Sequence, residues 1–580
     1  MAYSLSPGVQ WSEIDLTTVV PSTATTTGAF AGEFIWGPIN QIQTITNEVE
    51  LIRWFGKPSA NTQKLTQISG WWTAANFLSY SSDLKVVRVL ASGDKNATAN
   101  AAGLLIKNRD DYELNYINVS ATNATAKAAG MFAAKYPGDI ANGLRVSVFA
   151  SGNNANDFAN WSYASSFNGP PATSPFANTR GGANDEMHIV VVDSINGTFS
   201  GVPNTVLERF SYVSKAIDAK NDDGSSNYYV NILNEKSQYI YAIQHAMNTA
   251  TFAADTTTWG NTANGTAFSQ SNVSYSVTLG GGVTNEPVAG NVQNAYANTF
   301  GQIDLVDVSL IMMGAHPRTV SQWVIQNVAE NRKDCVVFVS PQYADVVGNP
   351  GQEATAAVAT RNQLGSSSYA VMDSAWKYQF DPYYNVYRWV PSNGDVAGLC
   401  ARTDQTRDPW YSPAGLNRGQ LKNVTKLSWQ PSKADRDTLY QNGINPIVTF
   451  KGDGTVLYGD KTLQAKPSAF DRINVRRLFI VLEKSISRAS KYSLFEFNDE
   501  FTRSQFVALV EPFLRDVKGR RGIYDFRVVC DETNNTPQVI DSNQFVGDIY
   551  IKPSRSINFI QLNFVAVRTG VAFSEIVGQF

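Results

Sequence analysis

Cysteine is nearly absent from this chain, with three residues among 580. Cys335, Cys400 and Cys530 are odd in number, lie far apart and form no CxxC pair. This spacing excludes a disulfide framework and a zinc ribbon, because both need closely paired cysteines. We therefore expect three buried free thiols.

Histidine is equally scarce. His188, His245 and His316 are isolated from one another, and each lies beside an apolar stretch. The chain therefore has too few histidines, too far apart in sequence, to indicate a histidine general base or a histidine metal site. The chain also lacks a G-x-S-x-G elbow that would present a nucleophilic serine. We expect no catalytic residue, no metal and no cofactor.

Charge is low. Charged residues make up 17% of the chain and the net charge is −3, whereas an average soluble protein has roughly 25% charged residues. Without a basic excess there is no stripe to bind phosphates, so nucleic acid is not an expected partner. The N-terminal segment lacks the features of a signal peptide and no run of 18 apolar residues occurs, so we expect folding in the cytosol and no membrane insertion.

Apolar residues, in contrast, are abundant. Hydrophobic residues account for 43% and aromatic residues for 12%. A chain of this length exceeds one hydrophobic core and predicts two or more domains. A weakly charged surface with many aromatics favours a protein whose faces are covered by neighbours, although an Asn-rich secreted protein would look similar.

The pattern of apolar runs predicts a mixed fold. GAFAGEFIWGPIN and KVVRVL are typical of buried strands, and NEVELIRWFG and WWTAANFLSY of helices. MHIVVVDS (187–194) predicts a strand and TVLERFSYVSKAI (205–217) an amphipathic helix after it. LVDVSLIMMG and CVVFVS predict two more strands around the helix SQWVIQNVAENR. The fold class is therefore α/β (α+β mixed), with several domains.

Domain boundaries follow from changes in composition. Residues 1–22, which lack helical periodicity, are predicted to form an extended arm, and 23–95 with 128–480 are predicted to form the α/β core region. The polar stretches 96–127 and 250–275 are predicted surface insertions, although the first could equally be a ragged part of the main domain.

The last hundred residues are predicted to form a C-terminal α+β domain (481–568) and a second extended arm (569–580). VRRLFIVLEKSI and FTRSQFVALVEPFLRDVKG predict helices, the second with a kink at Pro512. YDFRVVCD, FVGDIYIKP and INFIQLNFVAVR predict strands. The candidate residues of this C-terminal sheet are Val546, Ile549, Ile551, Ile560, Leu562 and Phe564.

One segment resembles a phosphate-binding loop. In KGDGTVLYGDKTL, Gly454 and Gly459 have the required spacing, but Asp460 separates the second glycine from Lys461. The lysine must follow that glycine directly to reach the phosphates, and a carboxylate there repels them. We therefore predict a β-turn between two strands. The nucleotide-dependent α/β enzyme that this loop would imply is a distant alternative.

Several segments resemble the tail sheath family of contractile-tailed bacteriophages, which is related to type VI secretion and R-type pyocin sheaths. The strongest is INVRRLFIVLEKSISRASKYSLFEFND (473–499), followed by a helix and KGRRG. Further similar segments, in the family's order, are SPGVQWSEID, GAFAGEFIWGP, AAKYPGDIANGLRVSVF, SSSYAVMDSAWKY, VPSNGDVAGLCARTD, PWYSPAGLNRG, LYQNGINPI and GTVLYGDKTL. The resemblance covers most of the chain.

The resemblance implies a structural protein and not an enzyme. It implies six-membered rings stacked around a tail tube in the virion, assembled in the host cytoplasm, with baseplate and tail terminator proteins as further partners. It also implies exchanged arms that add strands to a neighbour's C-terminal sheet, which an open sheet edge permits. The linking residues would be Val9, Trp11, Ile14 and Leu16 in the first arm and Val571, Phe573, Ile576 and Val577 in the second.

A basic cluster lies at the end of the second C-terminal helix. We expect the C-terminal domain to line the inner surface, with Lys518, Arg520 and Arg521 meeting an acidic face of the tube. These charges could equally serve only to complement the helix dipole. The sequence also leaves open whether the sheath belongs to a phage or to a phage-derived contractile injection particle or secretion system.

Overall fold

The computed structural model describes residues 25–118, 128–150, 155–194, 197–245, 258–270, 274–558 and 561. The chain divides into two compact units. The large unit is Pro21–Pro409 with Pro413–Ser487, and the C-terminal unit contains Trp410–Ser412 and the chain from Arg488 onward. The predicted arms, 1–22 and 569–580, lie outside the described residues, and the predicted domain boundaries stay a prediction.

Seven described strands form the main sheet of the large unit. They are parallel except β2, which runs antiparallel to β3 at one edge. Four of the predicted apolar runs supply β1, β3, β10 and β11, as expected for strands covered on both faces. The order is β16 (Ile444–Asn445), β12 (Ala370–Asp373), β11 (Val336–Val339), β10 (Leu310–Met312), β1 (Gly28–Gly32), β3 (Leu84–Arg88) and β2 (Gln43–Ile45).

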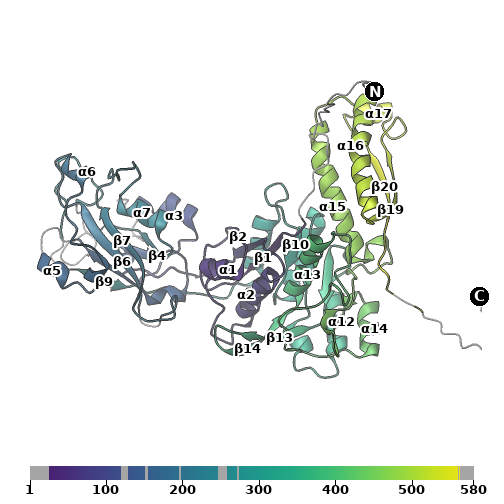
Figure 1. The fold of residues 1–580 in the computed structure, drawn as a ribbon, viewed down its shortest axis with the longest axis horizontal. Helices are drawn as coiled ribbons and strands as arrows, with labels where there is room; N and C mark the ends of the chain where they lie inside the picture. Colours follow the sequence, from purple (N-terminus) through teal and green to yellow (C-terminus); the bar gives the residue numbers. More distant parts are fainter. Residues whose placement is uncertain are drawn as a thin grey trace, which may run out of the picture. The chain divides into compact units, whose positions relative to one another are not determined.

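The two faces of this sheet enter two different hydrophobic clusters. Leu310 and Met312 belong to one cluster and Ile311, between them, to the other, as the period of two requires. Helices cover both faces (Figure 1). On the first face lie α2 (Leu65–Leu78), α13 (Asn393–Thr406) and α15 (Ile473–Ser490). On the second lie α8 (Ala289–Ala295), α9 (Arg318–Val324), α12 (Glu353–Leu364) and α14 (Lys433–Gln441).

Local sequence fixes where several helices begin and end. Helix α1 (Glu48–Phe55) starts after Asn47, whose side chain accepts a hydrogen bond from the Glu50 amide, and it stops at Gly56 with φ +76°. Helix α14 starts at Ser432. The predicted helices NEVELIRWFG and WWTAANFLSY are thus confirmed as α1 and α2. The helix predicted for SQWVIQNVAENR is α9, a π-helical turn (Ile325–Ala329) and α10 (Glu330–Arg332).

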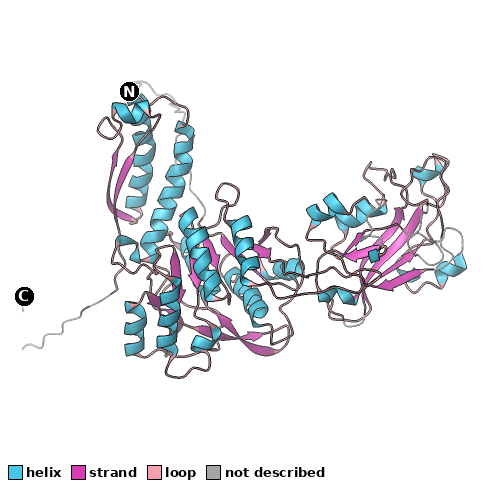
Figure 2. Cartoon of the chain, turned by 180° about the vertical axis from the view of Figure 1, so that it is seen from behind, coloured by secondary structure: helices cyan, strands magenta, loops and turns pink. Residues whose placement is uncertain are grey.

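A second sheet in the large unit is antiparallel and has its own core. Its order is β7 (Thr205–Ser214), β6 (Glu186–Asp193), β5 (Leu144–Phe149) and β9 (Tyr275–Thr278). Figure 2 shows these strands side by side. The two segments predicted as surface insertions contribute, in their described part, to the core of this antiparallel sheet. Ala97 of the first and Trp259 of the second are buried in its hydrophobic cluster. Around it lie α3 (Arg109–Asn115), β4 (Phe132–Ala134), α5 (Ala155–Ala159), α6 (Pro175–Asn178), α7 (Tyr229–Lys236) and β8 (Ile240–Ala242).

The predicted helix at 205–217 is wrong, because this segment is strand β7. Two register shifts relative to β6 insert an extra residue at each point, so the inward side chains are spaced by three instead of two. Leu207, Phe210 and Val213 face the core at this spacing. The bulges therefore give the inward side chains the spacing of an amphipathic helix. The strand-then-helix unit predicted for 187–217 is consequently two antiparallel strands.

The remaining strands of the large unit form small sheets. The phosphate-loop candidate is a hairpin, as predicted, with β17 (Ile447–Phe450) antiparallel to β18 (Gly454–Leu457). Its Asp460 is buried in an ion pair with Arg472 at 2.9 Å, and the Lys461 ammonium donates to the Tyr440 carbonyl at 2.8 Å. Further elements are α11 (Tyr343–Val346), β13 (Trp376–Asp381), β14 (Val386–Pro391) and β15 (Lys426–Leu427).

The C-terminal unit has few helices and strands in its described part. Its elements after the end of α15 are α16 (Glu500–Gly519), β19 (Ile523–Val529), α17 (Pro537–Asp541) and β20 (Asp548–Pro553). Figure 1 shows α16 beside the two strands. Pro512 lies inside α16, which continues on both sides of it. Most of the third predicted strand, INFIQLNFVAVR, lies outside the described residues.

Candidate interaction surface

Exposed apolar side chains are concentrated in the C-terminal unit. Of the 25 large hydrophobic side chains exposed among the described residues, ten lie between Tyr492 and Ile557. The densest group is the segment 492–501, hereafter the aromatic loop, where Phe495 is 104% and Phe497 83% exposed. Such density is typical of an interaction site, because a monomer rarely leaves contiguous apolar surface in water. The sequence signal was the run YSLFEFNDEF, whose exposure we did not predict.

Helix α16 packs beside strand β19. Phe506, Val510, Leu514 and Val517 are buried on its apolar stripe, whereas Phe513 is only half-buried. The Phe506 ring meets the Phe545 ring edge to face at 5.4 Å. The helix therefore also packs against the segment that leads into β20.

The two strands have a covered and an open face. Cross-strand partners point to the same side, so Phe526 and Ile551 share one face with the pair Val528 and Ile549, all half-buried. On the other face the pairs Asp525–Lys552 and Arg527–Tyr550 are exposed. We call this second set the tyrosine face. Ile549 and Ile551 thus lie in the C-terminal sheet.

Val546, also predicted in this sheet, lies two residues before β20. Its backbone is held by a side chain instead of a strand: Asn535 accepts from the Val546 N–H at 2.9 Å and donates to its carbonyl at 2.8 Å. The amide of Asn535 thus replaces one residue of a strand. Ile560, Leu562 and Phe564, like both sets of predicted arm residues, lie outside the described residues.

The three predicted basic residues are exposed at the end of α16. Lys518 pairs with Asp525 at 2.9 Å and lowers the pKa of that carboxyl. Arg520 pairs with Asp516 at 3.5 Å and lies over the Trp410 ring at 5.1 Å. Two of the three cations are thus partly balanced within the unit, which reduces the field they offer to a partner.

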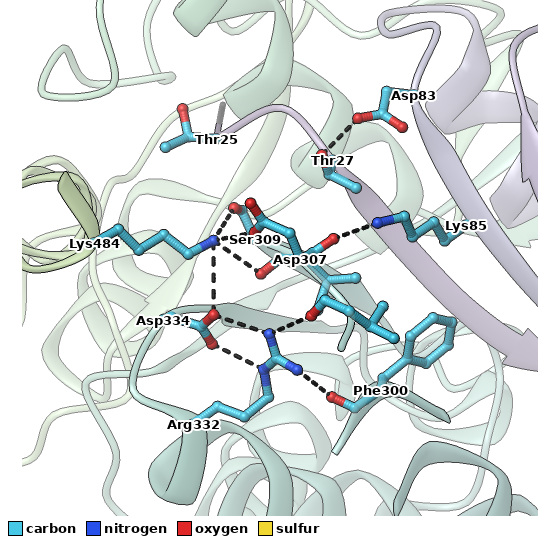
Figure 3. Close-up of polar contacts among 12 residues, drawn as sticks. Thr25, Thr27, Asp83, Lys85, Phe300, Asp307, Ser309, Arg332, Asp334 and Lys484 are labelled. Carbon is cyan, nitrogen blue, oxygen red and sulfur yellow. Dashed lines mark hydrogen bonds and ion pairs between the residues drawn. The ribbon is translucent and has the colours of Figure 1, made fainter. Parts of the chain in front are cut away.

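The second half of α15 is held within the large unit by a group of polar contacts around Lys484 (Figure 3). The Lys484 ammonium lies 2.5 Å from an Asp307 carboxylate oxygen, 3.7 Å from Asp334 and 3.1 Å from the Ser309 hydroxyl. Arg332 pairs with Asp334 through two hydrogen bonds of 2.8 and 2.9 Å. Such a two-bond contact between a guanidinium and a carboxylate fixes the relative orientation of the two groups as well as balancing their charges. These contacts anchor α15, the helix whose last residues lead into the C-terminal unit.

A further pair holds the same helix about two turns before Lys484. Arg477 and Asp404 form a buried ion pair, and the Thr25 hydroxyl donates to the same carboxylate at 2.5 Å. Burial raises the pKa of Asp404, while the neighbouring guanidinium lowers it. The charged partner offsets the cost of burial, so losing either residue would strand the other.

The three histidines and the three cysteines are buried in the fold. Burial lowers the pKa of all three histidines, that of His245 to about 4, and His316 contacts the Ala31 carbonyl at 2.7 Å. The three cysteines are buried, as predicted. No cluster of three His, Cys, Asp or Glu that suits a metal occurs in the described part of the chain. Nor does any helix there have the length and hydropathy to cross a membrane.

Family models match the second half of the chain. Residues 305–463 match the phage tail sheath protein central domain, and 465–566 match the phage tail sheath C-terminal domain. The tail sheath protein of Enterobacteria phage T4 is 35% identical, with 99% of each chain covered. The tail sheath protein of Vibrio phage KVP40 is also 35% identical, over 99% of this chain and all of the relative.

This chain belongs to the tail sheath protein family. It is a structural component of a contractile phage tail and not an enzyme. Solved sheath tail proteins share the fold: that of Desulfitobacterium hafniense has a TM-score of 0.51 at 9% identity, covering 95% of this chain and 100% of its own. That of Listeria innocua has a TM-score of 0.51 at 11% identity, covering 93% and 97%. The α/β fold class predicted for this sheath protein is confirmed.

Proposed function

We propose that this sheath protein polymerises as stacked six-membered rings around a tail tube and contracts to drive the tube through the host envelope. Family membership supports the sheath role, and the exposed apolar surface of the C-terminal unit carries the assembly part of the proposal. In water this surface costs free energy that contact with neighbouring subunits recovers. Assembly would take place in the host cytoplasm, ending at baseplate and tail terminator proteins.

The links between subunits are proposed to be exchanged terminal arms. Among the described residues, β19 and β20 pair only with each other, so the outer edge of each remains for an added strand. An arm making roughly five ladder hydrogen bonds at about 0.5–1.5 kcal/mol each contributes only a few kcal/mol before its ordering entropy is subtracted. Each subunit is held through several such links, and the high effective concentration of a tethered arm keeps the mesh connected.

Contraction is proposed to draw on energy stored in the lattice. The one loop that resembled a phosphate site is a hairpin whose Asp460 and Lys461 side chains bond within the protein. A bias of about 5.5 kcal/mol moves a two-state equilibrium from 1:99 to 99:1. Many coupled subunits, each gaining better contacts in the contracted lattice, supply this amount readily.

The tube contact is proposed to involve Lys518, Arg520 and Arg521. All three are exposed, which the contact needs, but the ion pairs to Asp525 and Asp516 compensate two of them. Reversing Arg520 and Arg521 to Glu should lower the yield of sheath bound to tubes. An unchanged yield and sheath length would remove the tube role while leaving the sheath role intact.

Electron microscopy of the purified full chain, beside a variant that lacks residues 1–20, tests the assembly proposal. We expect rings or hollow tubes from the full chain and their loss in the truncated one. Tubes from both proteins would contradict the arm linkage. Discrete monomers from both, with and without added tail tubes, would contradict polymerisation through this chain's own surface.

A further inference from the structure

The aromatic loop is unusual in both exposure and backbone. Tyr492, Leu494 and Phe501 are at least 62% exposed, beside the still more exposed Phe495 and Phe497. Phe495 also adopts φ +71°, a left-handed conformation that is strained for a bulky side chain. Among the described residues of the unit, no contact covers these side chains or offsets the strain, which points to a contact made in the assembled protein.

Charge accompanies the aromatic side chains. The aromatic loop contains Glu496, Asp499 and Glu500 and no basic residue, and Lys491 precedes it, so residues 491–501 have a net charge of −2. Asp499 is engaged as the cap of α16, where its carboxylate accepts from the Thr502 amide at 2.8 Å. The carboxylates of Glu496 and Glu500 are exposed. The loop therefore suits a surface that is basic and aromatic.

The tyrosine face of the same unit has this character. Tyr550 is 61% exposed, and the exposed Arg527 and Lys552 form no ion pair within 4 Å among the described residues. Asp525, the exposed carboxylate of this face, is already paired with Lys518. Tyrosine and arginine are the residues that most often dominate protein interfaces. The face lies on the opposite side of the two strands from the half-buried pairs.

We propose that the aromatic loop of one subunit docks on the tyrosine face of a second copy of this chain. The proposal rests on the proposed function and adds a side-chain contact to the exchanged arms, since it uses a sheet face and not a sheet edge. The carboxylates of Glu496 and Glu500 would meet Arg527 and Lys552, with Phe497 against Tyr550. Because the two surfaces differ, the contact is head-to-tail and propagates into rings or helices instead of closing a two-fold dimer.

Charge reversal tests the pairing in the full-length chain. The variants Glu496→Lys with Glu500→Lys, and Arg527→Glu with Lys552→Glu, should each raise the critical concentration for polymerisation about tenfold, measured by sedimentation. Combining all four changes should bring it back to within about threefold of the original. The matched controls Glu496→Asp and Arg527→Lys keep the charges and should polymerise normally. All substituted side chains are exposed, and circular dichroism checks that the variants fold.

The proposal is overturned if both reversals polymerise normally, or if the combined variant is not restored. Loss of tubes only in the chain lacking residues 1–20, with both reversals behaving normally, would keep the arm linkage and remove this contact. Failure of the unmodified chain to polymerise would count instead against the proposed function.

Cysteine cross-linking gives a second, geometric test on assembled protein. The three native cysteines are buried, so only the introduced, exposed thiols should form cross-links. A Phe497→Cys, Tyr550→Cys double variant should give a ladder of cross-linked oligomers, whereas a mixture of the two single variants should stop at dimers. Dimers from Phe497→Cys alone, or a cross-link to the tube protein instead of the sheath protein, would overturn the proposal.

Discussion

The two units of this sheath protein bury their strands to very different degrees. In the main sheet of the large unit, Leu310, Ile311 and Met312 are all fully buried, with helices on both faces. In β20 of the C-terminal unit no residue is fully buried, and Tyr550 points its ring into solvent. A parallel sheet is complete within its own chain, whereas a two-stranded sheet on one helix is marginal alone. The difference separates a self-sufficient scaffold from a surface that needs neighbours.

The largest effect is expected in the scaffold. Lys377 and Asp395 form a fully buried ion pair at 2.9 Å, and the Tyr80 hydroxyl donates to the same carboxylate. Asp395→Ala would leave the ammonium buried without its partner and should cost about 3–5 kcal/mol, measured by urea denaturation. The double variant Lys377→Met, Asp395→Leu should lose clearly less. An equal loss in both would mean that packing, and not the stranded charge, sets the cost.

Acid should weaken the same unit next. Burial lowers the pKa of His245 from 6.5 to about 4. The unfolded chain therefore binds the proton first as the pH falls, so stability is full above pH 6.5 and declines from there toward pH 4, by up to roughly 3 kcal/mol. His245→Gln should flatten this part of the stability profile measured by thermal unfolding. An identical pH dependence in both proteins would contradict a neutral, buried His245.

A smaller effect is expected where α15 is fastened. Lys484→Met keeps the aliphatic stem but removes the ammonium that contacts Asp307 and Ser309. Asp334 keeps Arg332, and Asp307 is partly exposed, so the loss should be about 1 kcal/mol. Hydrogen exchange should rise in α15 and stay unchanged in α16. Unchanged exchange in α15 would show that these contacts do not hold the helix.

The smallest effect on folding is expected in the aromatic loop. Phe497→Ser removes an exposed ring, and the free energy of unfolding should change by less than about 0.5 kcal/mol. Polymerisation should nevertheless weaken, because the same ring is buried only in the assembly. A loss of folding stability as large as that of a core substitution would place Phe497 in a core and break the contrast between the two units.

Sequence patterns predicted the scaffold better than the surface. Runs such as LVDVSLIMMG and CVVFVS predict strands, because a strand of a parallel sheet is covered on both faces and therefore has apolar residues on both. Strand β7 was missed because bulges at two points reset its alternation and gave Leu207, Phe210 and Val213 a helical spacing. Periodicity alone does not record a bulge; Tyr212, with φ +55°, marks one only in the structure.

The interaction surface was less accessible to sequence reasoning for another reason. A sequence does not distinguish a buried phenylalanine from an exposed one, and only the tertiary structure reveals that Phe495 and Phe497 are exposed. The basic cluster was visible, but its ion pairs to Asp525 and Asp516 depend on folding. Val546 was assigned to a strand because it is apolar, whereas the Asn535 side chain takes its backbone hydrogen bonds.

Hydrogen–deuterium exchange on monomer and polymer of the full chain would test most directly that the C-terminal unit is the assembly surface. The account predicts new protection in residues 492–501, β19 and β20 on polymerisation, with little change in β10 and β11. Protection that appears mainly in the large unit, with the aromatic loop and both strands exchanging as in the monomer, would contradict it.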